Sequence, residues 1–349
     1  MADNLVAKIA SSPHPYIIAE IGINHNGDME LARQMVDAAK EAGADCVKFQ
    51  SFLADRYISE RASKADYQQQ DDTVQGKSQR QIIKECELST EQAIDMKAYA
   101  TEKQIDFLST PFEVWSLREL QKIGVPGIKV SSCNLTNYPF LEELADSGLP
   151  VLLSTGMGAL NEVARAVHIF QRSGSPLLLF QCTSNYPSRI ENANLLVIPT
   201  YASLFGVPVG LSDHTTNHTT SIAAVALGAV AVEKHFTLSR DLPGIDQKAS
   251  IEPQDLRGLV EATREAHVAL GSPMKERTDE EENTAIALRR SLVAARDIKA
   301  GELCEPDMLA IKRPGTGLAV DHAERLAGAR FARDVEGDQP ITLDDFLEK

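Results

Sequence analysis

With 349 residues the chain exceeds a typical single domain, and it has room for one barrel of about 250 residues plus a small module. Its formal net charge of −15 argues against a general binder of nucleic acids or anionic membranes, because phosphate groups attract basic surfaces. An anionic small molecule can still bind through local lysines.

The cysteines and the N-terminal residues favour a reducing compartment. The five cysteines are odd in number and include no Cys-x-x-Cys pair, so neither a disulfide framework nor a thiolate zinc site is predicted. The first fifteen residues lack the apolar core of a signal peptide, and the apolar run at 222–232 is too short to span a bilayer. We therefore expect a soluble cytoplasmic protein that binds neither membranes nor nucleic acid.

Short β-rich runs alternate with amphipathic helical stretches from residue 16 to about residue 270. The predicted strands span residues 16–22, 46–50, 106–110, 127–131, 151–154, 176–182, 207–212 and 229–235. The predicted helices include residues 29–42, 89–103, 114–123, 160–172 and 253–270. Ser89 with Gln92 forms the pattern of a capping box at the start of one of them.

These repeats predict a (β/α)₈ TIM barrel over residues 1–270. Strands that helices cover on both faces read as continuous apolar runs, and the eight predicted strands do so. A doubly wound open sheet is the alternative, but no Gly-x-Gly-x-x-Gly follows an early strand to support a dinucleotide site.

A long polar insertion at 51–87 interrupts the alternation after the second strand, and it includes the polar stretch 67–72. An insertion at this point would lie over the C-terminal end of the barrel. A substrate lid and a plain surface loop both fit its composition.

Beyond the barrel, residues 271–288 form a predicted linker that contains a charged run. A weak repeat then relates residues 295–298 to residues 332–335 and predicts a small, pseudo-symmetric β-rich module at 289–349. The module contains the turn at 312–317, where two cations precede a proline and two glycines. This turn either aids solubility or contacts a ligand.

Two histidines lie at the ends of the last two predicted barrel strands. Because side chains alternate along a strand, Ser212 shares a face with His214, and Glu233 shares a face with His235. If the two strands are parallel neighbours, both imidazoles point into one site and can bind a metal. An ordinary hydrogen-bonded histidine is the alternative for each.

The C-terminal ends of the other strands also carry polar residues, where barrels of this kind build their active sites. These residues are Glu20, Lys48, Gln50, Ser109, Thr110, Lys129, Ser132, Ser154 and Gln181. Any single serine or threonine here can be a local backbone partner. Lys48 and Lys129, however, each close an apolar strand, and burying a lone ammonium costs several kcal/mol without a compensating negative charge. The set predicts a bound phosphate or carboxylate.

The histidine pair predicts a divalent metal beside that anion. Two protein ligands are too few for a structural zinc site, so water or substrate would complete the coordination of a catalytic Lewis acid. Mn²⁺ or Mg²⁺ suits the oxygen-rich surroundings better than Zn²⁺. Glu20, between the apolar Ile18 and Ile21, is the candidate for acid–base catalysis, or it pairs with a lysine.

Several motifs, in order along the chain, resemble those of the sialic acid synthases, the family of N-acetylneuraminate and legionaminic acid synthases. They are AEIGINHNG at 19–27, VKFQ at 47–50, STPF at 109–112, LSTGM at 153–157, GLSDH at 210–214 and EKHFT at 233–237. KRPG at 312–315 is similar to the C-terminal antifreeze-like (SAF, β-clip) domain of these enzymes. The resemblance covers nearly the whole chain. It implies a barrel that condenses phosphoenolpyruvate with an N-acylmannosamine-type aldose, uses Mn²⁺ or Mg²⁺, and forms a domain-swapped homodimer.

By motif position, the resemblance implies a role for each site residue. It makes His214 and His235 the metal ligands and Glu20 the catalytic carboxylate. The implied phosphoenolpyruvate-binding residues are Lys48, Thr110, Lys129, Ser132, Ser154, Asn185 and Ser212. The implied sugar-binding residues are Gln50, Tyr186, Asp246 and Arg313, of which Arg313 would reach the site of the partner subunit and meet the N-acyl group.

Two departures from the family pattern concern the sugar end of the site. Gly244-Ile245-Asp246 replaces the more usual Gly-Pro-Asp. Gln75-Gly76-Lys77-Ser78 stands where the family pattern leads us to look for an Asn-containing turn. Both departures bear on which sugar is the acceptor.

The implied reaction condenses phosphoenolpyruvate with N-acetylmannosamine to give N-acetylneuraminate and phosphate, with cleavage of the C–O bond of phosphoenolpyruvate. The metal would polarise the aldehyde, the methylene carbon of phosphoenolpyruvate would attack it, and water would add before phosphate leaves. The alternative acceptor is 2,4-diacetamido-2,4,6-trideoxymannose, which would give N,N'-diacetyllegionaminate. Two other hypotheses are a Schiff-base aldolase that uses Lys129 or Lys48, and a non-catalytic carbohydrate- or ice-binding protein.

Overall fold

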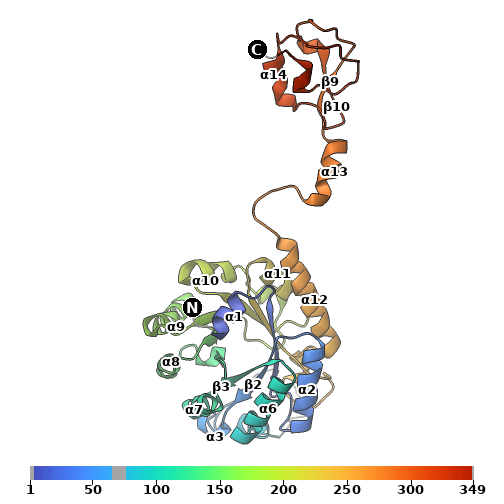
Figure 1. Cartoon of the computed structure of the whole chain (residues 1–349). Coiled ribbons are helices and arrows are strands. Elements are labelled where there is room, and N and C mark those ends of the chain that lie inside the picture. Colours follow the sequence, from blue (N-terminus) through green and yellow to red (C-terminus); the bar gives the residue numbers. More distant parts are fainter. Residues whose placement is uncertain (1–3, 65–75, 348–349) are drawn as a thin grey trace. The chain divides into compact units, whose positions relative to one another are not determined.

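The computed structural model describes residues 4–64 and 76–347. The chain divides into two compact units, Met1–Gly271 and Ser272–Lys349 (Figure 1).

Eight parallel strands form the centre of the first unit, and helices surround them (Figure 1). The strands are β1 (Tyr16–Gly22), β2 (Cys46–Ser51), β3 (Asp106–Pro111), β4 (Ile128–Val130), β5 (Val151–Ser154), β6 (Leu177–Cys182), β7 (Val209–Asp213) and β8 (Ala231–His235). Their order is β3-β2-β1-β8-β7-β6-β5-β4, and contacts between β3 and β4 close the ring without a hydrogen-bonded ladder. The predicted (β/α)₈ barrel is confirmed, and each strand lies within two residues of its predicted bounds.

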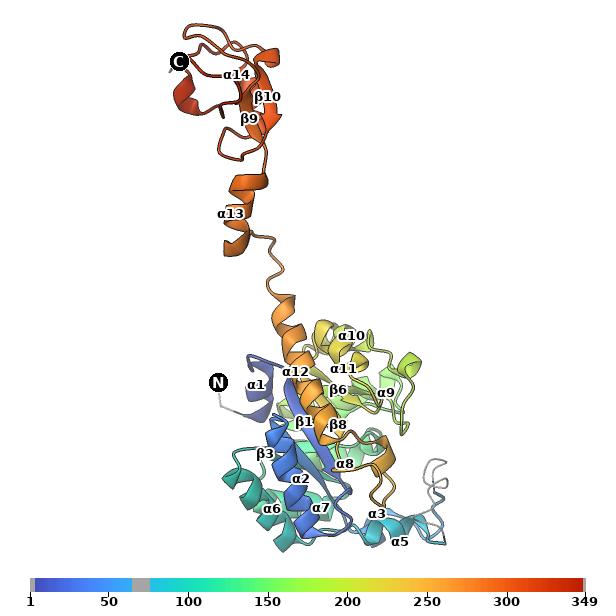
Figure 2. The ribbon, with the colours of Figure 1, turned by 90° about the vertical axis from the view of Figure 1, so that its right-hand side faces the viewer.

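Most helices of this unit cover the outside of the barrel, and α2 lies beside α12 along it (Figure 2). The helices of the unit are α1 (Leu5–Ala10), α2 (Met29–Glu41), α3 (Ala54–Tyr57), α5 (Gln79–Lys84), α6 (Thr90–Glu102), α7 (Val114–Ile123), α8 (Tyr138–Asp146), α9 (Leu160–Ser173), α10 (Val197–Phe205), α11 (Thr219–Ala226) and α12 (Pro253–Leu270). The five predicted helices correspond to α2, α6, α7, α9 and α12 within one residue. The capping box of Ser89 and Gln92 is present at the start of α6.

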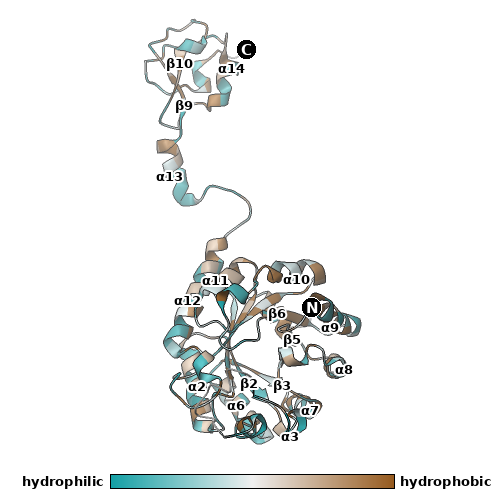
Figure 3. Ribbon diagram, turned by 180° about the vertical axis from the view of Figure 1, so that it is seen from behind, coloured by the Kyte–Doolittle hydropathy of each residue, from teal (hydrophilic) through white to brown (hydrophobic). Residues whose placement is uncertain are grey.

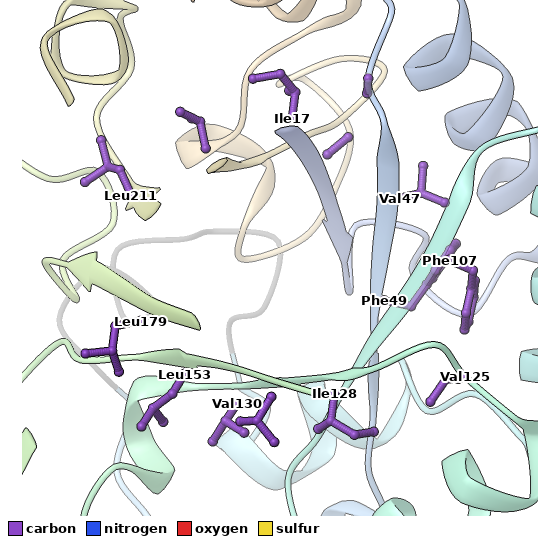
Figure 4. Close-up of a cluster of buried hydrophobic side chains, with 14 of the residues drawn as sticks. Ile17, Val47, Phe49, Phe107, Val125, Ile128, Val130, Leu153, Leu179 and Leu211 are labelled. Carbon is purple, nitrogen blue, oxygen red and sulfur yellow. The ribbon is translucent and has the colours of Figure 1, made fainter. Parts of the chain in front are cut away.

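The outward face of the strands is apolar over most of its length, because helices cover it. On β1, Ile17, Ala19 and Ile21 pack in a buried layer together with residues of α2 such as Met35 and Val36. Figure 4 shows strand residues of this layer, among them Ile17, Val47, Leu153 and Leu179. Burial of apolar surface stabilises a fold by about 25 cal/mol per Å², so this layer holds the barrel together.

The inward face changes character from one end of the barrel to the other. Near the start of the strands it is apolar, and Tyr16, Ile18 and Leu152 pack there against Leu5 and other residues of α1. We call this end the floor of the barrel. At the opposite end, the later inward-facing positions of the same strands carry the polar residues of the candidate site. Helix α1, which the sequence analysis did not predict, closes the floor.

The described part of the insertion at 51–87 contains α3 and α5. Its apolar residues Phe52, Ile58 and Ile83 pack in a small buried cluster with Ile23 and Ile245, which come from loops after β1 and β8. The polar stretch 67–72 lies outside the described residues.

The second unit contains α13 (Asp279–Leu288), β9 (Ser291–Ala294), β10 (Leu309–Lys312) and α14 (Ala323–Leu326). Helix α13 lies in the predicted linker, and Figure 3 shows its hydrophilic first half and hydrophobic second half. Strands β9 and β10 pair antiparallel, and Ile298 and Val335, one from each copy of the weak repeat, also form an antiparallel bridge. A separate buried cluster around Leu292 and Phe331 forms the core of this unit.

Among the residues that the structure describes, no helix is both long and apolar enough to cross a membrane. The five cysteines are free, and four of them are buried.

Candidate active site

A cavity of about 880 Å³ opens at the C-terminal ends of the barrel strands. Each of the eight strands, or the residues directly after it, contributes to its lining. The lining includes Glu20, Lys48, Gln50, Thr110, Lys129, Ser132, Ser154, Cys182, Tyr186, Ser212, His214, Glu233, His235 and Asp246. This main cavity therefore brings together the predicted site residues of the barrel, with the exceptions of Ser109, Gln181 and Asn185.

Two buried lysines and two buried carboxylates lie at the base of the main cavity. Lys48 Nζ lies 2.6 Å from Glu20 Oε2 and 3.7 Å from Glu233 Oε2. Lys129 Nζ lies 3.4 Å from Glu233 Oε1. Each of the four residues is at most 5% exposed. The carboxylates offset the cost of burying the ammonium groups, so the base of the cavity is balanced in charge before any ligand binds.

Hydroxyl and amide groups complete this base. Lys48 Nζ donates to Thr110 Oγ1 at 3.0 Å, and Lys129 Nζ donates to Ser154 Oγ at 2.5 Å. Gln50 Nε2 donates to Glu20 Oε1 at 3.0 Å. These donors converge on one part of the cavity, where they can surround an anionic ligand.

Ser212 and Ser132 have local partners of their own. Ser212 Oγ donates to Glu233 Oε1 at 2.9 Å, and Ser132 Oγ accepts from the backbone N–H of Gly156 at 2.9 Å. Gly156 has no space for a side chain, because an added Cβ would lie 2.2 Å from Ser184 Oγ and 2.8 Å from Ser132 Oγ. The glycine of the LSTGM motif thus allows the loop after β5 to pack closely against Ser132.

The two carboxylates have different proton affinities. Burial and the nearby Glu233 raise the pKa of Glu20, although Lys48 acts in the opposite direction. Burial also raises the pKa of Glu233, but Lys129 and Lys48 outweigh it and lower that pKa to about 2. A pair of acids whose pKa values are pushed apart suits one member to proton transfer and the other to a fixed negative charge. Glu20 is the member suited to proton transfer.

His214 and His235 face each other across the main cavity, with ring centroids 5.3 Å apart. The Tyr186 ring packs on both, at 4.1 Å from His214 and 5.5 Å from His235. His214 Nδ1 lies 2.8 Å from the carbonyl oxygen of Thr183. Because a carbonyl can only accept, Nδ1 carries the hydrogen, and Nε2 of a neutral ring is left with a free lone pair.

The surroundings of His235 keep its ring neutral. Burial lowers the pKa of His235 well below its usual value, and His214 and Lys48 add to this effect. Its Nδ1 atom is buried without a hydrogen-bond partner in the described structure and lies 3.8 Å from Asp246 Oδ2. Burial and Glu20 in turn raise the pKa of Asp246 to about 7. An unpartnered nitrogen on a neutral imidazole is available to bind a metal.

The arrangement fits a metal with two protein ligands. In residues 4–64 and 76–347, no group of three or more histidine, cysteine, aspartate or glutamate side chains is spaced to hold a metal ion. A closed structural site is therefore absent from the described residues. The two imidazoles can supply two ligands and leave the remaining positions to water or substrate, as a catalytic metal requires.

Four predicted site residues lie outside the main cavity, and one of them, Ser109, pairs through its hydroxyl with that of Ser51 at 2.7 Å. Asn185 is exposed and lines an adjoining cavity of about 540 Å³ that also contacts Gln181 and Tyr201. Gln181, which the sequence analysis placed among the polar strand ends, turns toward the carbonyl oxygen of Ala193. Arg313 belongs to the second unit, where it is exposed at the end of β10.

The main cavity also contains residues for which the sequence predicts no role. Glu233 was recognised only as a strand-end residue, although its register opposite Ser212 and the strand alternation place it beside both lysines. Cys182 lines the cavity in the position where we had expected Gln181. Its Sγ atom lies 3.5 Å from Ser132 Oγ.

The insertion lines the outer part of the main cavity with Arg56, Tyr57 and Ile58. Phe112 and Ile245 extend this wall, so much of the outer part is apolar. No pattern in the polar sequence of the insertion indicated these contacts. Ile245 is also the residue that departs from the Gly-Pro-Asp pattern, and it packs against the insertion.

The comparisons with known proteins agree with this architecture. Residues 35–275 match the NeuB family, and residues 289–347 match the SAF domain. The N,N'-diacetyllegionaminic acid synthase of Legionella pneumophila is 39% identical over 327 residues, which cover 92% of this chain and 92% of that protein. The N-acetylneuraminate-9-phosphate synthase of Mus musculus is 36% identical, over 94% of this chain and 92% of that protein.

A solved structure is similar as well. The N-acetylneuraminic acid synthetase of Leptospira borgpetersenii, crystallised with citrate, matches with a TM-score of 0.71 and 36% identity, over 78% of this chain and 90% of that chain. The family match covers more than half of the chain, and these relatives exceed 30% identity. The chain belongs to the NeuB family and is an enzyme, with a (β/α)₈ barrel followed by a SAF domain.

Proposed function

We propose that this enzyme condenses phosphoenolpyruvate with N-acetylmannosamine to give N-acetylneuraminate and phosphate. The observation that carries the proposal is the composition of the main cavity. Two buried lysines and a set of hydroxyl groups lie at its base, and two imidazoles face each other beside them. The relatives named as synthases of N-acetylneuraminate and legionaminic acid derivatives support this choice.

The base of the cavity would bind phosphoenolpyruvate. Lys48 and Lys129 would face its negative groups, while Thr110 and Ser154, which accept from these lysines, supply hydroxyl donors. Ser212 would line the same site, with its hydroxyl held by Glu233. Glu20 and Glu233 already balance the charges of the two lysines. The phosphate and carboxylate of the substrate therefore add negative charge that needs a further proton or cation. Protonated Glu20 and a divalent cation are two ways to offset it. The raised pKa of Glu20 makes the first of these easier near neutral pH.

His214 and His235 would hold a divalent metal, Mn²⁺ or Mg²⁺, with substrate or water in the remaining positions. When bound, such an ion polarises a carbonyl oxygen and stabilises the charge that develops on it. The Tyr186 ring, packed on both imidazoles, would keep the two rings in place.

In the proposed reaction, the methylene carbon of phosphoenolpyruvate attacks the aldehyde carbon of the open-chain sugar. A water molecule adds to the cationic carbon beside the carboxylate and gives up a proton, while the sugar oxygen takes one up, so the step needs no net proton. The carboxyl of Glu20, held by Gln50 and Lys48, is placed to move that proton. Collapse of the tetrahedral intermediate breaks the C–O bond and releases phosphate.

The outer wall of the main cavity bears on the identity of the acceptor. Tyr57, Ile58, Phe112 and Ile245 offer apolar surface to a sugar that carries methyl groups. N-acetylmannosamine has one acetyl methyl, and 2,4-diacetamido-2,4,6-trideoxymannose has two acetyl methyls and a ring methyl. The second sugar is therefore the alternative acceptor, and the similarity to the Legionella enzyme supports it.

We also propose that the enzyme acts as a domain-swapped dimer. Arg313 lies in the second unit and not among the residues that line the main cavity. The family resemblance implies that this arginine contacts the N-acyl group in the partner subunit's site. An Arg313→Ala variant mixed with an inactive barrel variant should then regain part of the activity, since a mixed dimer contains one intact site.

An acceptor panel tests the proposed function. Phosphate release from phosphoenolpyruvate is measured with Mn²⁺ and each candidate: N-acetylmannosamine, its 6-phosphate and the diacetamido sugar. We expect release to depend on the acceptor and to be fastest with N-acetylmannosamine. Fastest release with another sugar would change the acceptor but keep the chemistry. Trapping of a Lys129 adduct by borohydride, without phosphate release, would instead establish a Schiff-base aldolase.

A further inference from the structure

A buried ion pair lies directly behind the two histidines. Asp213 and Lys234 are register partners across β7 and β8, and each adjoins a histidine in the chain. Because side chains alternate along a strand, the pair points out of the barrel while His214 and His235 point into the main cavity. The two residues are 3% and 1% exposed, and Lys234 Nζ lies 2.8 Å from Asp213 Oδ2.

The carboxylate of Asp213 gathers the segments that follow both strands. Its Oδ2 atom accepts hydrogen bonds from Thr220 Oγ1 and Ser221 Oγ, each at 2.6 Å, in the first turn of α11. Its Oδ1 atom accepts from the backbone N–H of Thr215 at 2.9 Å, directly after His214. The start of α11 and the turn after His214 are thus fixed to the end of β7.

Lys234 extends this network from β8. Besides Asp213, its Nζ atom donates to the carbonyl oxygen of Asn217 at 2.9 Å, within the turn between His214 and α11. The ammonium of one strand therefore holds the loop that leaves the other strand. No part of this network lines the main cavity.

Side chains of successive residues thus link β7 to β8, first on the inner face of the barrel and then on its outer face. Ser212 and Glu233 pair inside the barrel through a 2.9 Å hydrogen bond, and Asp213 and Lys234 pair outside it in the next register position. A slip of one residue would break both links and would exchange the faces on which the side chains lie. The next residues along the two segments are His214 and His235, whose ring centroids lie 5.3 Å apart. The separation of the two imidazoles is thereby set by the pairs that precede them.

We infer that Asp213 and Lys234 are positioning residues that set the separation and orientation of His214 and His235 for metal binding. The inference rests on the proposed function, in which these imidazoles hold a divalent metal. An apolar pair of similar volume would fill the same space, but it would not hold the turn after His214. Loss of outer groups that orient metal ligands typically weakens metal affinity about 10- to 100-fold.

The test measures Mn²⁺ affinity, which a purely structural role would not change in a folded protein. The full chain is stripped of metal, and Mn²⁺ is titrated with and without phosphoenolpyruvate while free Mn²⁺ is followed by electron paramagnetic resonance. In the double variant Asp213→Asn/Lys234→Met, both charges are removed together, so neither is left unpaired. We expect this variant to fold and to bind Mn²⁺ about tenfold or more weakly than the wild type.

Asp45→Asn is the matched control. Asp45 accepts from the backbone N–H of Ile17 at 2.8 Å and lies 3.4 Å from Arg264 Nη2, at the floor end of the same barrel. We expect this variant to lose stability but to bind Mn²⁺ as the wild type does. A loss of Mn²⁺ affinity equal to that of the double variant would overturn the inference, because any weakening of the barrel would then have the same effect.

A milder variant keeps the inference testable if the double variant does not fold. Thr220→Val/Ser221→Ala retains both charges and removes two hydrogen bonds to Asp213, and we expect a few-fold loss of Mn²⁺ affinity. If either variant folds and binds Mn²⁺ as tightly as the wild type, the inference is overturned, but the proposed metal site is not. Failure of the wild type to bind Mn²⁺ would overturn the proposed metal site and the inference together.

Discussion

The floor and the cavity end of the barrel are built on the same strands but differ in what their inward-facing side chains do. At the floor, Tyr16, Ile18 and Leu152 are packed under α1. Two residues further along β1 the inward position is Glu20, and two further along β5 it is Ser154, and both line the main cavity. The strands thus devote one end to packing and the other to buried charge. We expect changes at the floor to affect stability and changes in the cavity to affect catalysis.

Removal of one imidazole should have the largest effect on turnover. We expect His235→Ala to reduce the rate of phosphate release about a thousandfold, since a Lewis acid contributes several kcal/mol to the transition state. The free energy of unfolding should change little, because the Nδ1 atom of His235 has no hydrogen-bond partner to lose. Steady-state kinetics and urea unfolding check the two halves of this expectation. His267→Ala, on the exposed face of α12, is the control.

Replacement of the carboxyl of Glu20 should have the next largest effect. Glu20→Gln keeps the shape of the side chain but cannot transfer a proton, and general acid–base catalysis typically contributes about 10²- to 10⁴-fold. We expect kcat to fall within this range and the KM for phosphoenolpyruvate to change less than kcat. A variant with wild-type kcat would remove Glu20 from the proposed mechanism.

A floor substitution should give the opposite result. Leu178 is fully buried in the floor cluster, and Leu178→Ala should lower the free energy of unfolding by about 2 to 5 kcal/mol. We expect the folded fraction to turn over at nearly the wild-type rate when it is assayed well below its melting temperature. A large loss of kcat in the folded variant would show that the two ends of the barrel are not separable.

The smallest effect concerns the acid stability of the wild type. The pKa of Glu233 is lowered from 4.5 to about 2 in the folded state, so its ionised form stabilises the fold above pH 4.5. That contribution is lost as the pH falls through the folded-state pKa. We therefore expect the difference in unfolding free energy between the wild type and Glu233→Gln to shrink from pH 4.5 toward pH 2. Urea unfolding across this range measures it, and a constant difference would contradict the assigned charge.

The barrel and the inner ring of the site were predictable from the sequence, the barrel from apolar runs that alternate with helical stretches and the ring from the alternation of side chains along a strand. The apolar runs fixed where strands lie, and the alternation from Ser212 to His214 and from Glu233 to His235 predicted that both histidines share one cavity. Glu233 could have been given a role by the same argument, since Lys48 and Lys129 required negative partners.

Other features depend on contacts between distant segments and could not be read from the sequence. Helix α1 is short, and only its position under the floor explains it. The contacts of Tyr57 and Ile58 with the cavity depend on how the insertion folds back onto the barrel. Asn185 adjoins Tyr186 in the chain, yet the two residues line different cavities. The turn after β6, and not the spacing, decides which of them faces the main cavity.

The fate of the bridging oxygen of phosphoenolpyruvate tests the central claim most directly. Phosphoenolpyruvate labelled with ¹⁸O at this position is incubated with N-acetylmannosamine, Mn²⁺ and the enzyme, and the released phosphate is analysed by mass spectrometry. Attack of water on carbon breaks the C–O bond, so the label should appear in the phosphate. Unlabelled phosphate, or acceptor-independent release, would contradict the proposed condensation.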